Sequence, residues 1–230
     1  MKGKSKNIIR LSKGIFPFLM AAMLALPYLY AARYAVISSD DVSNLLHVRH
    51  IMKNEGVGHL AASLLATRNI YMNNQGTWFS SLVEFFSLSF EAFDNVKTLH
   101  IFLLVSDAAF FFGILFFMAR ISDYFLQGRF LAPFYLLVFI TAMSYESPSE
   151  ILYWMTGDCV YTIPLAMMLI AAGLFLGYLK KQNRWEIVTA CVLAVLASGG
   201  NLLISGFFCA FELCIILLDY REGRKPLRGE

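Results

Sequence analysis

Residues 99–119, LHIFLLVSDAAFFFGILFFMA, decide the fold class that this sequence predicts. Only Ser106 and Asp107 interrupt the middle of this run, which as a helix is long enough to cross the roughly 30 Å hydrocarbon core of a bilayer. The whole chain of 230 residues has a matching composition, because 58% of its residues are apolar and 15% are charged. Soluble domains carry about 25% charged residues. The sequence therefore predicts an all-α integral membrane protein.

Five further apolar segments extend this pattern along the chain, at residues 15–36, 130–145, 157–179, 187–200 and 202–219. We therefore expect a single membrane domain, residues 1–230, that forms a polytopic transmembrane helix bundle of about six spans. The segment at 130–145 is short for a span and is expected to borrow flanking residues or to thin the bilayer locally. The first segment could instead be a signal peptide, but it is longer than the roughly 15 residues of such an apolar core.

The distribution of positive charge orients these spans. With the N-terminus inside, the cytoplasmic segments collect 14 of the 19 Lys and Arg residues, in keeping with the positive-inside rule. We therefore expect both termini in the cytoplasm and a large extracytoplasmic loop at residues 38–97. Inside this loop, residues 78–93 place large apolar side chains on one helix face and Ser and Glu on the other. This pattern predicts an amphipathic helix that lies in the membrane interface.

Two adjacent acids, Asp40 and Asp41, follow the first apolar segment in the sequence Ser38-Ser39-Asp40-Asp41. A pair of carboxylates at a membrane boundary can bind a divalent cation, orient a sugar hydroxyl or act as a general base, because partial desolvation makes a carboxylate more basic. Ser and Asp before an apolar stretch are also the usual signal for a helix N-terminus. The spacing favours this helix cap, and the two roles are compatible with each other.

Two histidines, His47 and His50, lie three residues apart on the helix that would follow the acid pair. Together with Asp40 and Asp41 they could bind a divalent metal ion such as magnesium or manganese. A set of carboxylate and imidazole ligands suits manganese or zinc better than magnesium. Solvated histidines in a hydrophilic loop would give the same pattern.

Two further acids, Asp107 and Glu212, fall inside predicted spans. An acid at this depth costs roughly 2.5 to 3.5 kcal/mol on insertion scales, so each must face protein, water or a cation. Both an ion path and interhelical hydrogen bonds are consistent with their positions. The four cysteines all lie in apolar segments and are expected to be small buried side chains rather than disulfide or zinc ligands. No block of basic and aromatic residues indicates nucleic acid as a partner.

Three residues, Trp154, Gly157 and Tyr161, share one helix face at the outer entrance of the span at 157–179. Glycine permits close approach of a ligand or another backbone, and the aromatic rings could stack on a sugar or lie among lipid headgroups. Asp158, which follows Gly157, belongs to the same candidate substrate-binding set.

Four short motifs in this chain resemble, in combination, those of an uncharacterised bacterial family of polytopic membrane proteins. They are Asp40-Asp41 after the first span, Gly76-Thr77-Trp78-Phe79, Trp154-x-x-Gly157-x-x-x-Tyr161-x-x-Pro164, and Ser198-Gly199-Gly200-Asn201. That family is similar to the GT-C glycosyltransferases, which take sugars from polyprenyl-phosphate carriers. The resemblance extends over residues 15–205 and is most specific in the tryptophan, glycine, tyrosine and proline pattern.

The resemblance implies an extracytoplasmic active site in a bacterial inner membrane. Asp40 and Asp41 would act as base or metal ligands toward a glycan or lipid acceptor, and the helices near Trp78 would frame the lipid-linked donor. Arg49 or Arg68 would neutralise the phosphate of that donor. GT-C enzymes usually have more than six spans, so the resemblance also implies an oligomer or a partner membrane subunit.

Two other functions are compatible with the same residues. The chain could be a small transporter or flippase-type subunit that uses Asp107 and Glu212 as an intramembrane ion path. It could also be a non-catalytic membrane scaffold, in which none of these acids would contribute beyond folding.

Overall fold

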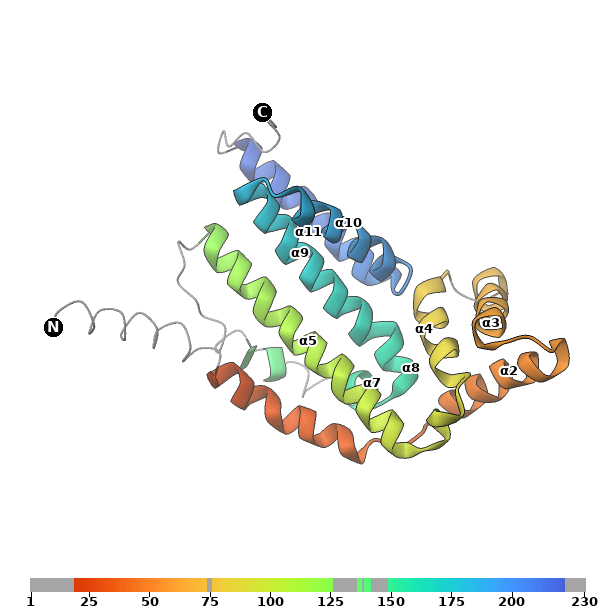
Figure 1. The fold of residues 1–230 in the computed structure, drawn as a ribbon. Helices are drawn as coiled ribbons and strands as arrows, with labels where there is room; N and C mark the ends of the chain where they lie inside the picture. The colour runs from red at the N-terminus through yellow and green to blue at the C-terminus, as the bar shows by residue number, and fades with distance from the viewer. Residues whose placement is uncertain (1–18, 74–75, 126–135, 138, 142–148, 222–230) are drawn as a thin grey trace.

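The computed structural model describes residues 19–73, 76–125, 136–137, 139–141 and 149–221. All regular secondary structure in these residues is helical, which confirms the all-α prediction. Figure 1 shows a bundle of long helices, formed by α5 (Val96–Phe125), α9 (Ile163–Lys181), α10 (Arg184–Ser198) and α11 (Leu202–Arg221). A second group of helices lies at one end of this bundle: α2 (Ser39–Glu55), α3 (His59–Asn73) and α4 (Trp78–Leu88).

Three helical segments of the described residues are long and apolar enough to cross a membrane: Val96–Phe125, Met155–Lys181 and Leu202–Arg221. They contain three of the predicted spans. A fourth span results if Leu19–Tyr34 and α2, which meet at a bend of 61°, form one broken segment. These helices support the prediction of a membrane protein.

The remaining two predicted spans differ from this pattern. Helix α10 has 15 residues and is therefore about 22 Å long, which is shorter than the hydrocarbon core of a bilayer. Most of the predicted span at 130–145 lies outside the described residues. The described part of the chain thus supports three or four spans. The total of six spans stays a prediction, as does the cytoplasmic location of both termini.

The predicted loop at 38–97 is a packed helical unit. Helix α2 ends at Gly56, whose φ of 60° is a left-handed conformation that glycine adopts without steric cost, and α3 then folds back. A buried cluster joins Val48 of α2, Ala62 of α3 and Phe85 of α4 to Leu103 of α5. This apolar contact fixes the helical unit against one end of the bundle.

Helix α4 has the polar and apolar faces that the sequence predicts, but the polar face is the buried one. Ser80, Ser81 and Glu84 are buried, whereas Phe86 is exposed. A soluble protein would show the opposite arrangement. In lipid surroundings, polar groups find their partners inside the protein and apolar side chains face outward, so this orientation is the one expected at a membrane.

The core of the bundle lies between α5 and α9, where small residues allow the helices to approach closely. A Cβ added to Gly113 of α5 would lie 3.1 Å from the carbonyl oxygen of Ala166 in α9. A Cβ added to Gly173 of α9 would lie 2.7 Å from the ring of Phe116. Contacts of this kind are common between membrane helices. These contacts pack α9 closely against α5.

Candidate functional site

The acid pair begins α2 with a reciprocal helix cap. The Ser38 hydroxyl accepts a hydrogen bond from the Asp41 N–H at 3.2 Å, and the Asp41 carboxylate accepts one from the Ser38 N–H at 2.9 Å through Oδ2. This capping box satisfies two backbone donors that the first turn of a helix leaves free. The structure therefore confirms the helix-cap interpretation, with Asp41 as the acid that takes part.

The second carboxylate oxygen of Asp41 joins α2 to the start of the Met155–Lys181 segment. Asp41 Oδ1 accepts hydrogen bonds from the N–H of Thr156 at 3.0 Å and from its hydroxyl at 2.7 Å. Thr156 lies in α8 (Met155–Gly157), the short helix that opens this segment. Both oxygens of Asp41 are thus engaged within the protein, and the residue is only 1% exposed.

A second acid, Glu84 of α4, reaches the same threonine. Glu84 Oε1 lies 2.6 Å from the Thr156 hydroxyl and 2.6 Å from the Asn44 side-chain nitrogen. A threonine hydroxyl has one hydrogen, so it cannot donate fully to both Asp41 and Glu84. The contacts are all satisfied when Glu84 carries a proton and donates to Thr156, which in turn donates to Asp41.

Burial favours the protonated form of Glu84. Loss of solvent is the largest effect and raises the pKa of its carboxyl group. Hydrogen bonds from Thr156 and Asn44 lower this pKa, and the negative charges of Asp41 and Asp40 raise it. The sequence analysis assigned no role to Glu84, Thr156 or Asn44. One signal was available, because Glu84 is the single acid in the apolar sequence of α4.

Four of the predicted site residues line one cavity of about 350 Å³ between α2, α4 and the start of the Met155–Lys181 segment: Asp40, Trp154, Gly157 and Tyr161. Glu84 and Thr156 also contribute to its wall. Asp40 is exposed, unlike its neighbour Asp41, which does not line the cavity. The tertiary structure thus separates the two acids into one that faces the cavity and one that is buried.

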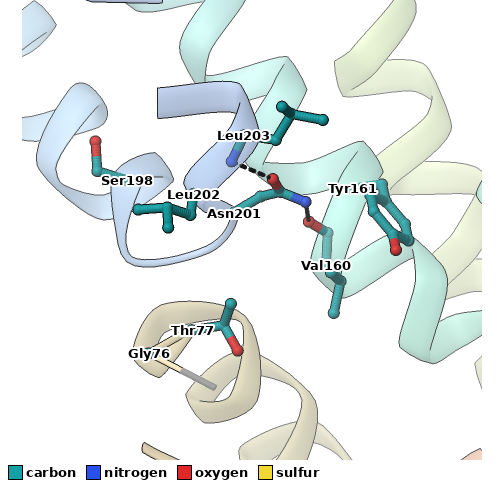
Figure 2. A pocket seen from close by; sticks show the side chains of 8 residues that line it. All are labelled: Gly76, Thr77, Val160, Tyr161, Ser198, Asn201, Leu202 and Leu203. Atoms are coloured by element: carbon teal, nitrogen blue, oxygen red, sulfur yellow. Dashed lines mark hydrogen bonds between the residues drawn. The ribbon is translucent and has the colours of Figure 1, made fainter. Parts of the chain in front are cut away.

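Figure 2 shows the residues that line a second cavity, of about 380 Å³. The two cavities share the lining residues Thr77, Val160 and Tyr161. Leu202 and Leu203 line only the second cavity, whereas the polar side chains of Asp40, Asn44 and Glu84 line only the first. Tyr161, which is 45% exposed, therefore stands at the boundary between a polar and a more apolar compartment.

The backbone between these cavities is a π-helical turn, η3 (Asp158–Thr162), that precedes Pro164. Residue 164 would donate its N–H to the Val160 carbonyl in an α-helix and to the Cys159 carbonyl in a π-helix, but proline has no N–H. Side chains replace it. The Ser80 hydroxyl lies 2.7 Å from the Cys159 oxygen and 2.8 Å from the Gly200 oxygen, so its one hydrogen is shared between them, and the Asn201 side-chain amide donates to the Val160 oxygen at 3.2 Å. Figure 2 shows this last bond.

The glycine turn at residues 198–201 packs directly against the start of α4. The Phe79 N–H donates to the Gly199 carbonyl at 2.8 Å. A Cβ added to Gly199 would lie 2.2 Å from the Trp78 ring, and one added to Gly200 would lie 2.4 Å from Pro164. Trp78 thus packs on this turn and does not line the polar cavity. The turn holds α4 against η3.

The predicted phosphate-binding arginines have separate surroundings. Arg49 forms an ion pair with Asp94 at 2.7 Å and donates to the Phe90 carbonyl at 3.1 Å, so it is engaged within its own helical unit. Arg68 is exposed on α3. Neither lines either cavity.

The predicted metal ligands do not gather in one place. In the described residues no group of three or more His, Cys, Asp or Glu side chains lies close enough together to hold a metal ion. His47 packs its ring 5.9 Å from the ring of Phe85, and His50 pairs with Asn54 at 2.8 Å. Asp40 is the only predicted ligand that lines the polar cavity.

The predicted intramembrane acids lie on different helices. Asp107 of α5 is fully buried, and Glu212 of α11 is half-buried. Asp158 is also fully buried and accepts a short hydrogen bond from Ser106 of α5, so it faces the bundle and not the polar cavity.

Comparisons of this chain with models of protein families, with curated proteins and with solved structures gave no match. The roles discussed below therefore rest on the geometry of the cavities and on the chemistry of the residues that line them.

Proposed function

We propose that this chain is a glycosyltransferase-like membrane protein that moves a sugar from a polyprenyl-phosphate carrier to a glycan or lipid acceptor. The observation that carries the proposal is that Asp40, Trp154 and Tyr161 line a single cavity at one end of the bundle. Its volume of about 350 Å³ falls within the roughly 300 to 1,000 Å³ of small-molecule sites. The proposed setting is a bacterial inner membrane, with the cavity on the extracytoplasmic side.

Asp40 is the proposed general base. It is exposed and lines the cavity, so it can meet an acceptor hydroxyl that enters from water. The acceptor oxygen would attack the anomeric carbon of the donor sugar while its proton passes to Asp40. The bond from that carbon to the phosphate oxygen breaks, and polyprenyl phosphate leaves with the bonding electron pair. Glu84 lines the same cavity, but its carboxyl group is already hydrogen-bonded to Thr156 and Asn44, so Asp40 is the proposed base.

The aromatic residues are the proposed sugar contacts. Trp154 and Tyr161 lie seven positions apart, and both line the cavity. The buried indole nitrogen of Trp154 has no hydrogen-bond partner among the described residues, so its N–H is available to a sugar oxygen. Flat aromatic faces and a free donor are a suitable combination for a sugar ring.

The lipid part of the donor is assigned to the second cavity. Leu202 and Leu203 supply an apolar wall there, and Tyr161 and Thr77 connect it to the polar cavity. A carrier seated in this cavity would present its phosphate near the shared wall. The amphipathic α4, with Phe86 facing outward, would border the entrance from the membrane.

A divalent ion, magnesium or manganese, is a proposed cofactor. Asp41 does not fit as a ligand, because both of its oxygens already accept hydrogen bonds. Asp40 fits as a metal ligand in place of its role as base, since magnesium is often held by one or two carboxylates together with substrate phosphate oxygens. Chelation with EDTA is therefore expected to abolish transfer, and added magnesium or manganese to restore it.

The test is a transfer assay in membranes with a labelled polyprenyl-phosphate sugar. The Asp40→Asn variant is expected to lose roughly 100-fold or more in turnover, the usual contribution of a general base. Glu91→Gln serves as the control, because Glu91 is an exposed acid of the same helical unit that lines neither cavity. Unchanged turnover in Asp40→Asn would rule out the catalytic role.

A second candidate is a small transporter or flippase-type subunit, which the full burial of Asp107 favours. In that case Asp107→Asn and Glu212→Gln, and not Asp40→Asn, would abolish flux in proteoliposomes. If none of these variants changed transfer or flux, a non-catalytic scaffold that binds a partner subunit would be the remaining function.

A further inference from the structure

Two buried acids inside the bundle line neither of the two cavities. Asp107 of α5 and Asp158 of η3 are each 0% exposed. Asp158 is the charged group that acts on Asp107, and α5 packs directly against η3. Ser106, the residue before Asp107 in α5, donates its hydroxyl to Asp158, so the two acids flank one hydrogen bond between segments that are apolar enough to cross a membrane.

The hydrogen bonds around this pair leave most of its oxygens without a partner. Ser106 donates its hydroxyl to Asp158 Oδ2, and the same hydroxyl lies 3.0 Å and 3.1 Å from the carbonyls of Phe102 and Leu103. Both oxygens of Asp107 and Oδ1 of Asp158 are buried and have no hydrogen-bond partner among the described residues. Buried carboxyl oxygens are normally paired, so this set requires an additional binding partner.

Positive charge is not available near the pair in the described part of the chain. Asp158 is the charged group that affects Asp107, and Ser106 of α5 and Thr162 of η3 hydrogen-bond to Asp158. Before α8, Tyr153 is close enough to be affected by Asp107. The Tyr153 hydroxyl donates to the carbonyl of Tyr28 in the first helix at 3.1 Å, so it is already engaged. No Lys, Arg or His side chain among the described residues acts on either acid.

We propose that Asp107 and Asp158 form a proton-binding site between α5 and η3. A proton neutralises one carboxylate and supplies the O–H donor that the unpaired oxygens lack. A metal ion would need several more ligands than these three free oxygens. The site is independent of the transfer reaction proposed above, since neither acid lines either cavity.

The position of Asp158 gives this site a connection to the polar cavity. Asp158 begins the π-helical turn whose Val160 and Tyr161 line both cavities, and it follows Gly157 in the wall of the polar one. Release of the proton would leave two buried negative charges side by side. Their repulsion would act on the turn that separates the two cavities.

Infrared spectroscopy of the purified chain in lipid nanodiscs tests the proposal. A protonated carboxylic acid has a carbonyl stretch that a carboxylate lacks. To remove the signal of the buried Glu84, the measurement is made in a Glu84→Gln background at neutral pH. We expect the band there, unaffected by transfer into heavy water because the pair is buried, and we expect it to be lost or displaced when Asp107→Asn or Asp158→Asn is added. Absence of the band from the Glu84→Gln protein would overturn the proposal, whether or not either aspartate variant folds.

Labelling with an apolar carbodiimide provides a second readout, because this reagent modifies protonated carboxyl groups in apolar surroundings. Peptide mass spectrometry is expected to find the label on Asp107 or Asp158 and not on the exposed Asp94. Labelling should fall as the pH rises and should not respond to sodium or potassium. Protection by either cation would show that a metal ion occupies the site and would overturn the assignment to a proton.

Discussion

Asp41 accepts two hydrogen bonds from Thr156 through a single carboxylate oxygen, one from the backbone N–H at 3.0 Å and one from the hydroxyl at 2.7 Å. The residues are 115 positions apart in the chain. This contact ties the N-terminus of α2 to the start of the Met155–Lys181 segment and so shapes the polar cavity between them. It also explains why the two adjacent aspartates have different environments.

Asp41→Ala is expected to destabilise the protein far more than Asp40→Ala. The Asp41 variant loses the capping box and leaves buried donors of Ser38 and Thr156 unpaired, which costs about 1 to 3 kcal/mol. Replacement of the exposed Asp40 should change the free energy of unfolding by no more than about 0.5 kcal/mol. Thermal unfolding in detergent measures both, and equal effects would contradict the separation of roles.

Glu84→Gln is expected to reduce the dependence of stability on pH. The folded protein raises the pKa of Glu84 above its ordinary value of 4.5, so the folded state binds the proton more tightly than the unfolded state. The stabilisation is complete below the unfolded pKa and is lost as the pH rises through the folded pKa. Gln is neutral at every pH and removes this loss. Unfolding midpoints between pH 4 and pH 8, with Glu91→Gln as the control, measure the slope; identical slopes in wild type and Glu84→Gln would refute the assignment.

Gly199→Ala is expected to destabilise the contact between the glycine turn and α4. The new Cβ would lie 2.2 Å from the Trp78 ring, and overpacking of this kind costs about 1 to 3 kcal/mol. Gly206→Ala is the matched control, because a Cβ at that position of α11 meets nothing within 4 Å. The cost should shrink in a Trp78→Ala background. A cost that is independent of Trp78 would show that the ring is not the cause.

Ser80→Ala is expected to destabilise the π-helical turn through the Cys159 carbonyl. That oxygen accepts from the Ser80 hydroxyl at 2.7 Å and has no N–H donor from Pro164, so loss of the hydroxyl costs about 1 to 3 kcal/mol. Pro164→Ala restores an N–H and should reduce this cost. Ser87→Ala, on the same helix, is the control. A double-mutant cycle measures the coupling, and its absence would contradict the role given to proline.

The position of the site could be predicted only in part from the sequence. The motifs at 76–79, 154–164 and 198–201 were recognisable as local patterns, and the structure brings all three together around η3. Their pairing was not predictable, because the contacts join Ser80 to Cys159 and Phe79 to Gly199 over 79 or more positions. Glu84 was missed for a related reason. Glu84 belongs to the polar face of α4, which the sequence places only in an interfacial amphipathic helix. In the structure Glu84 is buried against Asn44 and Thr156.

By itself the sequence determined the features that depend on neighbouring residues. Composition and run length established an all-helical chain with apolar segments, and Ser38-Ser39-Asp40-Asp41 marked the start of a helix, because hydrophobic periodicity and capping act within a few residues. Only the tertiary structure decided that Asp40 faces a cavity while Asp41 holds Thr156, and that Asp107 meets Asp158. These outcomes depend on helices that are distant in sequence and packed together in space, where burial and pairing determine what each carboxyl group can do.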